Sequence, residues 1–151
     1  MVMKFSRIIE APIDVCFSAL LGNVRVRRWL GGELETEFSV LAEESMEGSG
    51  FRESYPPFWE LTGEVTAFNR PTLISVEFTA NVLNTKGNSA HRFKELGPNK
   101  TELNLDLEIV DDTVAKRAAL QLVKGQIDKF CTAQLETTKQ VAESKVAKLS
   151  A

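Results

Sequence analysis

Hydrophobic and polar residues alternate through most of the first three quarters of the chain. The clearest example is the segment ELNLDLEI at residues 102–109, in which every second residue is leucine or isoleucine. Successive side chains of a strand point to opposite faces of a sheet, so this pattern predicts a strand with one buried face. The segment NTKGN at residues 84–88 predicts a loop. Further strands are predicted near residues 1–10, 34–40, 51–55, 59–67, 74–80 and 91–94.

Between the first two strands the sequence predicts two short helices. Pro12 suits the first turn of a helix, because its missing N–H is not needed there. Gly22-Asn23 predicts the end of this helix. A second helix over residues 24–30 is predicted to stop at Gly31-Gly32.

The last quarter of the chain has the period of a helix. Asp111-Asp112-Thr113 suits a helix N-terminus, where hydroxyl and acidic side chains are favoured. A helix is predicted over about residues 113–148, with its end fraying beyond Val141. One stripe at helical spacing is apolar and consists of Ala119, Leu120, Val123, Ile127, Phe130 and Cys131.

The order of these elements predicts an α+β fold in a single domain over residues 1–151. An antiparallel sheet of six or seven strands would have one apolar face, and only the C-terminal helix is long enough to cover it. A single helix is about 10 Å across and cannot fill the concave side of a curved sheet. A cavity lined by apolar side chains is therefore predicted between them, which is the usual form of a small-molecule site.

Composition supports one soluble globular domain. The chain has 151 residues, of which 43% are hydrophobic and 26% charged, and it is long enough to bury a core without disulfides or metals. No segment approaches the roughly 20 apolar residues of a membrane span. Cys16 and Cys131 lie far apart without metal-ligand spacing, and they predict reduced thiols in a cytoplasmic protein.

Charge argues against nucleic acid as a partner. The formal net charge is -3, and residues 33–64 carry many glutamates against Arg52 alone. Such a surface repels a phosphate backbone. The short basic cluster of Arg25, Arg27 and Arg28 is interpreted as a solvated face in preference to an anion site.

Motifs of the common metal, nucleotide and hydrolase sites are missing from the sequence. The chain has no glycine-rich phosphate loop, no HExxH, no GxSxG and no cluster of histidine and cysteine. His91 is the only histidine. No metal or cofactor is therefore expected.

Three segments resemble the SRPBCC/START superfamily. They are FSRIIEAPIDVCFSALLGNVRVRRWLGG at residues 5–32, LTGEVTAFNRPTLISVEF at residues 61–78 and HRFKELGPNKTELNLDLEI at residues 91–109. The first is similar to the family's strand ending in Ala-Pro, followed by a short helix and a tryptophan, here Trp29. In the last segment Lys100 stands where the family's hairpin has glycine. The resemblance implies the helix-grip fold, a curved sheet wrapped around a long C-terminal helix.

Members of this superfamily differ widely in function. They include plant pollen allergens of the Bet v 1-like type, plant hormone receptors, lipid-transfer START domains, aromatic polyketide cyclases, coenzyme-Q-binding proteins and activators of heat-shock ATPases. Because one fold hosts many activities, function has to be inferred from the site.

Polar residues on the predicted inward faces are candidates for orienting a ligand, namely Glu53, Tyr55, His91 and Gln134. If Glu53 faces inward, desolvation would raise its pKa and it could act as an acid or base; at the sheet edge it would be hydrated. His91 could orient a ligand or move a proton, or it could be a core histidine with one hydrogen bond. Gln134 lies in the apolar stripe of the helix, which either a cavity-facing amide or a stripe extending past the sheet would explain.

Apolar candidates for the cavity wall are distributed over the sheet and the helix. Plain packing accounts for each of them as well as ligand contact does. They are Phe38, Trp59, Phe78, Phe93, Val123, Ile127 and Phe130.

Three functions are compatible with these residues. In the first, the chain binds a small hydrophobic or aromatic molecule in the cavity, for transport, sensing or sequestration. In the second, it is a cyclase or dehydratase without metal or nucleotide cofactor, and Glu53 or His91 moves a proton. In the third, it binds a protein as heat-shock-ATPase activators do, through the acidic residues 33–64 or the basic residues 25–28. A homodimer is compatible with each.

Overall fold

A computed structural model describes residues 1–26, 28–29, 32–36, 47–48, 50–55 and 59–150. Strands dominate the first three quarters, and one long helix forms the last quarter, as the hydrophobic pattern predicts. The elements in chain order are β1 (Val2–Ile9), α1 (Ile13–Val26), β2 (Arg28–Trp29), β3 (Gly32–Thr36), β4 (Gly50–Tyr55), β5 (Trp59–Asn69), β6 (Leu73–Ala80), the 3-10 helix η1 (Val82–Asn84), β7 (Thr85–Gly97), β8 (Lys100–Ile109) and α2 (Val114–Ser150).

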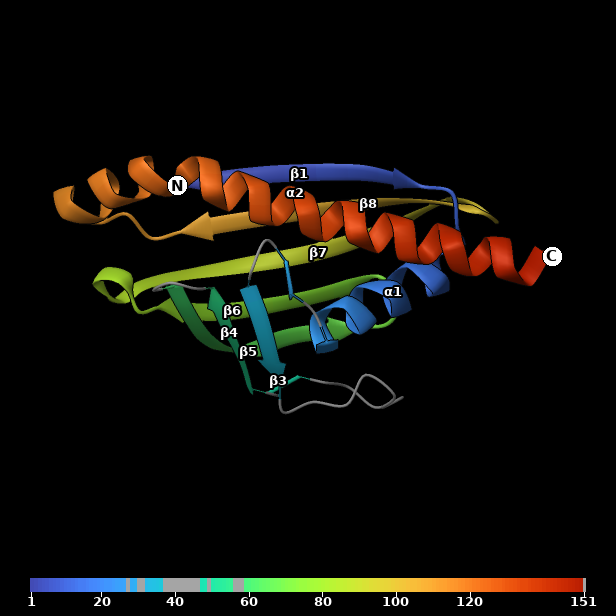
Figure 1. Ribbon diagram of the computed structural model, residues 1–151, viewed down its shortest axis with the longest axis horizontal. Helices are drawn as coiled ribbons and strands as arrows, with labels where there is room; N and C mark the ends of the chain where they lie inside the picture. The colour runs from blue at the N-terminus through green and yellow to red at the C-terminus, as the bar shows by residue number, and fades with distance from the viewer. Residues whose placement is uncertain (27, 30–31, 37–46, 49, 56–58, 151) are drawn as a thin grey trace.

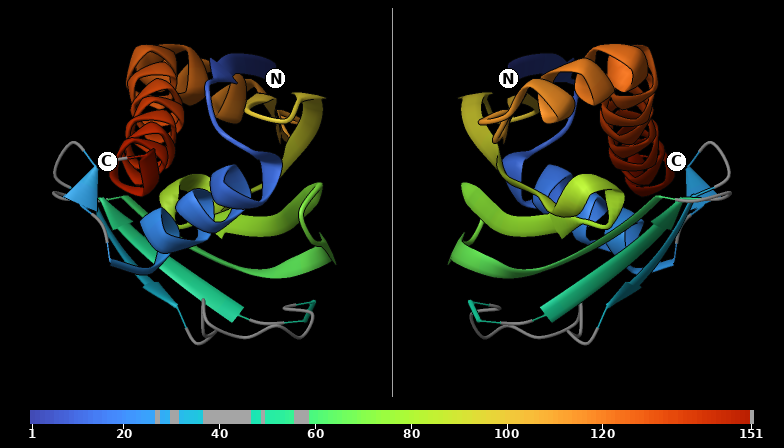
Figure 2. Two further views of the ribbon diagram at one scale, coloured as in Figure 1. Left: turned by 90° about the vertical axis from the view of Figure 1, so that its right-hand side faces the viewer. Right: turned by 90° about the vertical axis from the view of Figure 1, so that its left-hand side faces the viewer.

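All the described strands belong to one antiparallel sheet, in the order β1-β8-β7-β6-β5-β4-β3-β2. Helix α2 lies along β1, and the sheet curves away from it through β7, β6 and β5 (Figures 1 and 2). Helix α1 packs against both α2 and the sheet. This is the α+β architecture that the order of elements predicts and the helix-grip arrangement that the resemblance implies, with eight strands among the described residues in place of six or seven.

The prediction of two short helices after the first strand is wrong. One helix, α1, continues through Gly22-Asn23 to Val26, and the two-residue strand β2 follows where a second helix was expected. Phe17, Leu20 and Leu21 are buried on the inner face of α1. A glycine inside a helix costs about 1 kcal/mol, which is less than the burial of these side chains contributes. Tertiary packing therefore carries the helix past the expected breaker.

The end of α2 is also more firmly packed than predicted. Thr138 and Ala142 are completely buried, and Val146 packs against the main core cluster. The helix continues to Ser150, so the expected fraying beyond Val141 does not occur.

The main core lies between α1, the C-terminal half of α2 and the inward face of the sheet. Phe17 is at its centre, with ring centroids 5.5 Å from Phe68 and 5.3 Å from Phe93 in edge-to-face arrangements. The guanidinium of Arg70 lies 5.3 Å above the Phe17 ring. A second, smaller cluster surrounds Leu120 at the N-terminal half of α2.

The corner between β1 and α1 is closed by buried hydrogen bonds to one carbonyl. The Thr101 hydroxyl donates to the Ala11 carbonyl at 2.8 Å, and the Cys16 thiol lies 3.6 Å from the same oxygen. Burial raises the pKa of the Cys16 thiol, so Cys16 stays protonated at neutral pH. Both side chains are fully buried, and the Ala11 carbonyl therefore has protein hydrogen-bond donors and needs no water.

We expect Thr101→Val to lower the free energy of unfolding by about 1–2 kcal/mol, because valine keeps the volume but leaves the Ala11 carbonyl with the weaker thiol donor alone. Urea denaturation measures the loss. Thr62→Val, on the exposed face of β5, is the matched control and should change stability by less than about 0.5 kcal/mol. Equal effects of the two substitutions would contradict the assigned role of Thr101.

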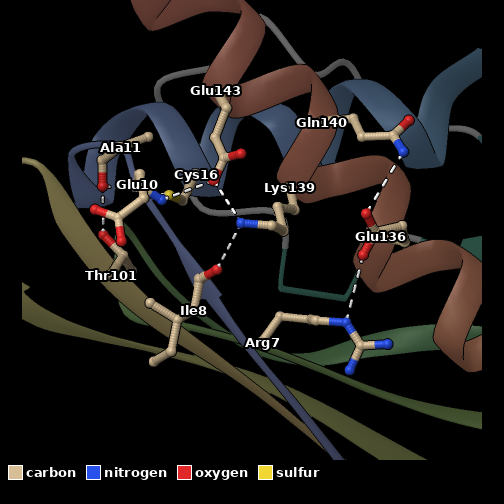
Figure 3. Close-up of polar contacts among 10 residues, drawn as sticks. All are labelled: Arg7, Ile8, Glu10, Ala11, Cys16, Thr101, Glu136, Lys139, Gln140 and Glu143. Carbon is tan, nitrogen blue, oxygen red and sulfur yellow. Dashed lines mark hydrogen bonds and ion pairs between the residues drawn. The ribbon is translucent and has the colours of Figure 1, made fainter.

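Polar contacts also attach α2 to the end of β1 (Figure 3). The Lys139 ammonium donates to the Ile8 carbonyl at 3.0 Å and pairs with the Glu143 carboxylate at 2.6 Å. Glu143 accepts a further hydrogen bond from the Glu10 backbone N–H. Burial acts to raise the pKa of Glu143, but these hydrogen bonds outweigh it and the pKa is lowered. The contacts fix the C-terminal half of α2 against β1.

Candidate functional site

A hydrogen bond between two predicted site residues links the sheet to α2. His91 on β7 is opposite Ile74 of β6 and Leu105 of β8, both of which are buried. Its Nε2 lies 2.9 Å from Oε1 of Gln134 on α2. His91 is 9% exposed. The sequence singles out both residues separately, and the structure brings them together as a polar pair at the sheet–helix interface.

The environment keeps the His91 imidazole uncharged. Burial lowers its pKa to about 4, against a smaller opposing effect of the Gln134 hydrogen bond. Desolvation disfavours the protonated, charged form of a histidine, and the pKa therefore falls. At neutral pH the pair consists of a neutral imidazole and a neutral amide.

The sheet side of this region has apolar side chains that remain partly accessible. Leu61 on β5 and Val76 and Phe78 on β6 share the inward face with His91 by strand alternation and register, yet each is only half-buried. The Phe78 ring lies over Gly87, where an added β-carbon would be 2.5 Å from Cζ of the ring. These residues leave apolar surface open on the inward face of β5 and β6.

The helix side shows the same contrast along its length. Leu135 and Thr138, in the C-terminal half of α2, are completely buried. Further towards the N-terminus, Val123, Ile127 and Phe130 are only half-buried. Ile127 packs against the smaller core cluster, whereas Val123 belongs to neither cluster. Along this stripe of α2, the side chains of Val123, Ile127 and Phe130 are thus more accessible than those of Leu135 and Thr138, and Gln134 lies between the two groups.

Phe93 has a clear packing role. It is buried and stacks edge-on against Phe17 of α1. It lies two residues from His91 on the same face of β7, so its buried ring lies next to the polar pair. Contact between Phe93 and a ligand stays a prediction.

Several predicted site residues fall outside the part of the chain whose side chains are described. The register pairs Glu53 of β4 with Leu61 of β5, and Tyr55 with Trp59. Phe38 lies outside the described residues altogether. The roles of Phe38, Glu53, Tyr55 and Trp59 in the site remain predictions.

Arg7 is an inward-facing charge that was not among the residues predicted from the sequence. It is opposite Leu103 on the face that β1 turns towards α2, and its Nε lies 3.5 Å from the Glu136 carboxylate. A signal for it exists in the sequence, because Arg7 shares one face of a predicted strand with Phe5 and Ile9. The two side chains are 35% and 45% exposed, so the pair borders the interior and does not enter it.

One hollow among the described residues lies elsewhere, on the outer face of the sheet. It has a volume of about 440 Å³ and is lined mainly by outward positions of β5, β6 and β7. Its lining consists of Thr62, Gly63, Glu64, Glu77, Phe78, Thr79, Lys86, Gly87, Asn88 and Val110. It is thus distinct from the predicted interior cavity, although Phe78, which is predicted to line that cavity, also lines this hollow.

The described residues do not meet the requirements of a metal site or of a membrane-spanning helix. In the part of the chain that the structure describes, no three histidine, cysteine, aspartate or glutamate side chains gather as a metal site would require. No described helix is long and apolar enough to cross a membrane. The side chains of residues 22–46, which include the basic cluster and much of the acidic segment, lie outside the described part of the chain.

Comparisons with known proteins identify the fold. No protein-family model and no curated protein sequence matches the chain. Among solved structures, it is similar to the Zhui aromatase/cyclase from Streptomyces sp. R1128, with 17% identity and a TM-score of 0.74 over 97% of this chain and 95% of that one. A conserved protein from Geobacillus kaustophilus matches with 12% identity and a TM-score of 0.66, over 95% and 97% of the two chains.

A third similar structure is that of a longer protein, of which only a part matches this chain. The di-domain ARO/CYC StfQ from the steffimycin biosynthetic pathway matches 96% of this chain at 12% identity and a TM-score of 0.67, and this match covers 46% of StfQ. The TM-scores establish a shared fold, and at identities this low they leave the activity of the chain open. The chain has the helix-grip fold that its resemblance to the SRPBCC/START superfamily implies.

Proposed function

We propose that this chain, with a fold that aromatase/cyclases also adopt, binds a small hydrophobic or aromatic molecule between the sheet and α2. The site lies between the inward face of β5–β7 and the N-terminal half of α2. One observation carries the proposal: a polar pair of the buried His91 and the half-buried Gln134 borders apolar side chains that are still partly accessible. Apolar walls with a few fixed polar groups are typical of small-molecule sites.

Affinity and orientation would have separate sources. Apolar surface removed from water contributes about 25 cal/mol per Å², and Val76, Phe78, Val123 and Ile127 offer such surface. The His91–Gln134 pair would orient the ligand. Phe38, Glu53, Tyr55, Trp59, Phe93 and Phe130 are proposed as further contacts.

Substitution of adjacent residues on α2 tests where the ligand binds. We expect phenylnaphthylamine, a neutral apolar fluorophore, to bind the wild-type protein saturably with one site per chain. Val123→Trp places a large ring on the inward face and should weaken binding at least about tenfold, because it fills the space the probe needs. Leu122→Trp adds the same ring at a position that is 87% exposed and should leave binding unchanged.

Fluorescence titration gives both affinities, and circular dichroism confirms that each variant is folded. Equal binding by both variants would place the probe outside the site, and the absence of saturable binding to wild type would refute the proposal. Organic extraction of protein purified from its host, followed by mass spectrometry, then identifies the natural ligand.

An enzymatic role of the cyclase or dehydratase type is the second candidate. The observation in its favour is the buried neutral imidazole of His91, which can accept a proton. A general base works best with a pKa near the operating pH, and a pKa of about 4 makes His91 a weak base at neutral pH. This difference favours ligand binding over acid–base chemistry as the first proposal.

A further inference from the structure

We infer that Gln134 is a positioning residue that determines ligand specificity: it holds the proton of His91 on Nε2, so that the site selects ligands presenting a hydrogen-bond donor to Nδ1. This inference rests on the proposed function and defines the class of ligand more narrowly. The favoured ligand is a small aromatic molecule with a hydroxyl or N–H group, over the same molecule with that group methylated.

The position of the proton follows from the hydrogen bond between the two side chains. Nε2 of His91 is 2.9 Å from Oε1 of Gln134, and an amide oxygen can only accept. Nε2 must therefore carry the hydrogen. A neutral imidazole has one such hydrogen, so Nδ1 presents a lone pair.

This lone pair has no donor within the described part of the chain. Among the described residues, the His91 side chain forms one hydrogen bond, which joins its Nε2 to Gln134. His91 is nine-tenths buried, so water does not freely replace a missing donor. A buried acceptor without a donor is unfavourable, and a ligand hydroxyl would satisfy it.

The same geometry disfavours ligands that lack a donor. An ether oxygen placed at Nδ1 would bring two lone pairs together, and a C–H group would leave the acceptor unsatisfied. Sites built to hydrogen-bond a substrate hydroxyl reject analogues without it much more strongly than apolar pockets reject a changed methylene. Gln134 thus controls selectivity by acting on His91, whether or not it touches the ligand itself.

Naphthol and its methyl ether are a suitable pair of probes, since they share the ring and differ in the donor. We expect wild-type protein to bind naphthol at least about tenfold more tightly than the ether, as expected for one buried hydrogen bond. Gln134→Leu removes the acceptor, frees the proton to occupy Nδ1 and should reduce the preference to within about twofold. Gln134→Glu keeps an acceptor at Nε2 and should retain the preference at a pH where His91 is neutral and naphthol still carries its hydroxyl proton.

Nitrogen NMR reports the tautomer directly, and its signals are unambiguous because His91 is the only histidine. The wild-type spectrum should show a protonated Nε2 and the Gln134→Leu spectrum a mixture of tautomers. A protonated Nδ1 in the wild type, or equal affinity for the two probes, overturns the inference even if phenylnaphthylamine binds. Failure of all three probes to bind refutes the proposed function itself. If Gln134→Leu does not fold, the wild-type tautomer and probe preference decide.

Discussion

Acidification from about pH 7 to pH 4 should lower the free energy of unfolding by about 3 kcal/mol through His91 alone. Burial lowers the pKa of His91 in the folded state to about 4 from an ordinary value of 6.5. A pKa that differs by one between the folded and unfolded states corresponds to about 1.4 kcal/mol. Below the unfolded-state pKa the unfolded chain binds a proton that the folded chain does not. Stability is therefore complete above about pH 6.5 and is lost as the pH falls towards 4.

Urea denaturation of wild type and His91→Gln over a series of pH values isolates this effect. Glutamine can still donate to Gln134 but does not titrate, so its stability curve should be flatter in this range. Glu143, whose lowered pKa also removes stability in acid, is common to both proteins and cancels in the difference. Parallel curves for the two proteins would show that His91 is hydrated in the folded state.

Leu135→Ala should lower the free energy of unfolding by about 2–5 kcal/mol, a large part of the roughly 5–15 kcal/mol that stabilises a typical domain. Leu135 is 0% exposed and lies in the main core cluster beneath α2. Truncation removes apolar burial and leaves a cavity that the surrounding core cannot close fully.

The same substitution on the outer side of the helix provides the control. Leu122 is 87% exposed on α2, so Leu122→Ala changes propensity and composition equally but removes no packing. It should alter stability by less than about 0.5 kcal/mol. Thermal and urea unfolding of both variants measure the contrast, and similar losses would show that α2 docks on the sheet through another face.

Alternation predicts the sheet well wherever one face is buried and the other is hydrated. Leu103, Leu105, Leu107 and Ile109 of β8 are all buried, as their period of two requires. Strand number and exact helix ends are less predictable, because packing against distant elements decides them. The continuation of α1 through Gly22-Asn23 is the clearest case.

The predicted loop over residues 84–88 shows the same limit. Strand β7 begins at Thr85 and includes Gly87, whose register partner is Phe78. Asn and Gly ordinarily signal a turn, but here the glycine leaves room for the Phe78 ring. A local signal of this kind does not distinguish a turn from a close contact between strands.

The two members of the polar pair could be singled out from the sequence, but their contact could not be predicted. The sequence shows that His91 is the only histidine and that Gln134 is an amide in an apolar stripe. Nothing in the sequence indicates that these two side chains meet. Their contact depends on how α2 crosses the curved sheet, which is set by Leu135, Thr138 and Ala142 further along the helix. Packing elsewhere on α2 thus determines whether these two side chains meet.

The position of β1 has a consequence for how the chain is made. Every other described strand pairs with a sequence neighbour, whereas β1 pairs with β8, and Val2 is opposite Glu108. During synthesis the hairpins from β2 onwards can form early, because their strands are close in sequence. Strand β1 can pair only after β8 has been synthesised. Until then β1 and the apolar face of α1 need protection from aggregation, so the growing chain is expected to depend most on chaperones before β8 and α2 leave the ribosome.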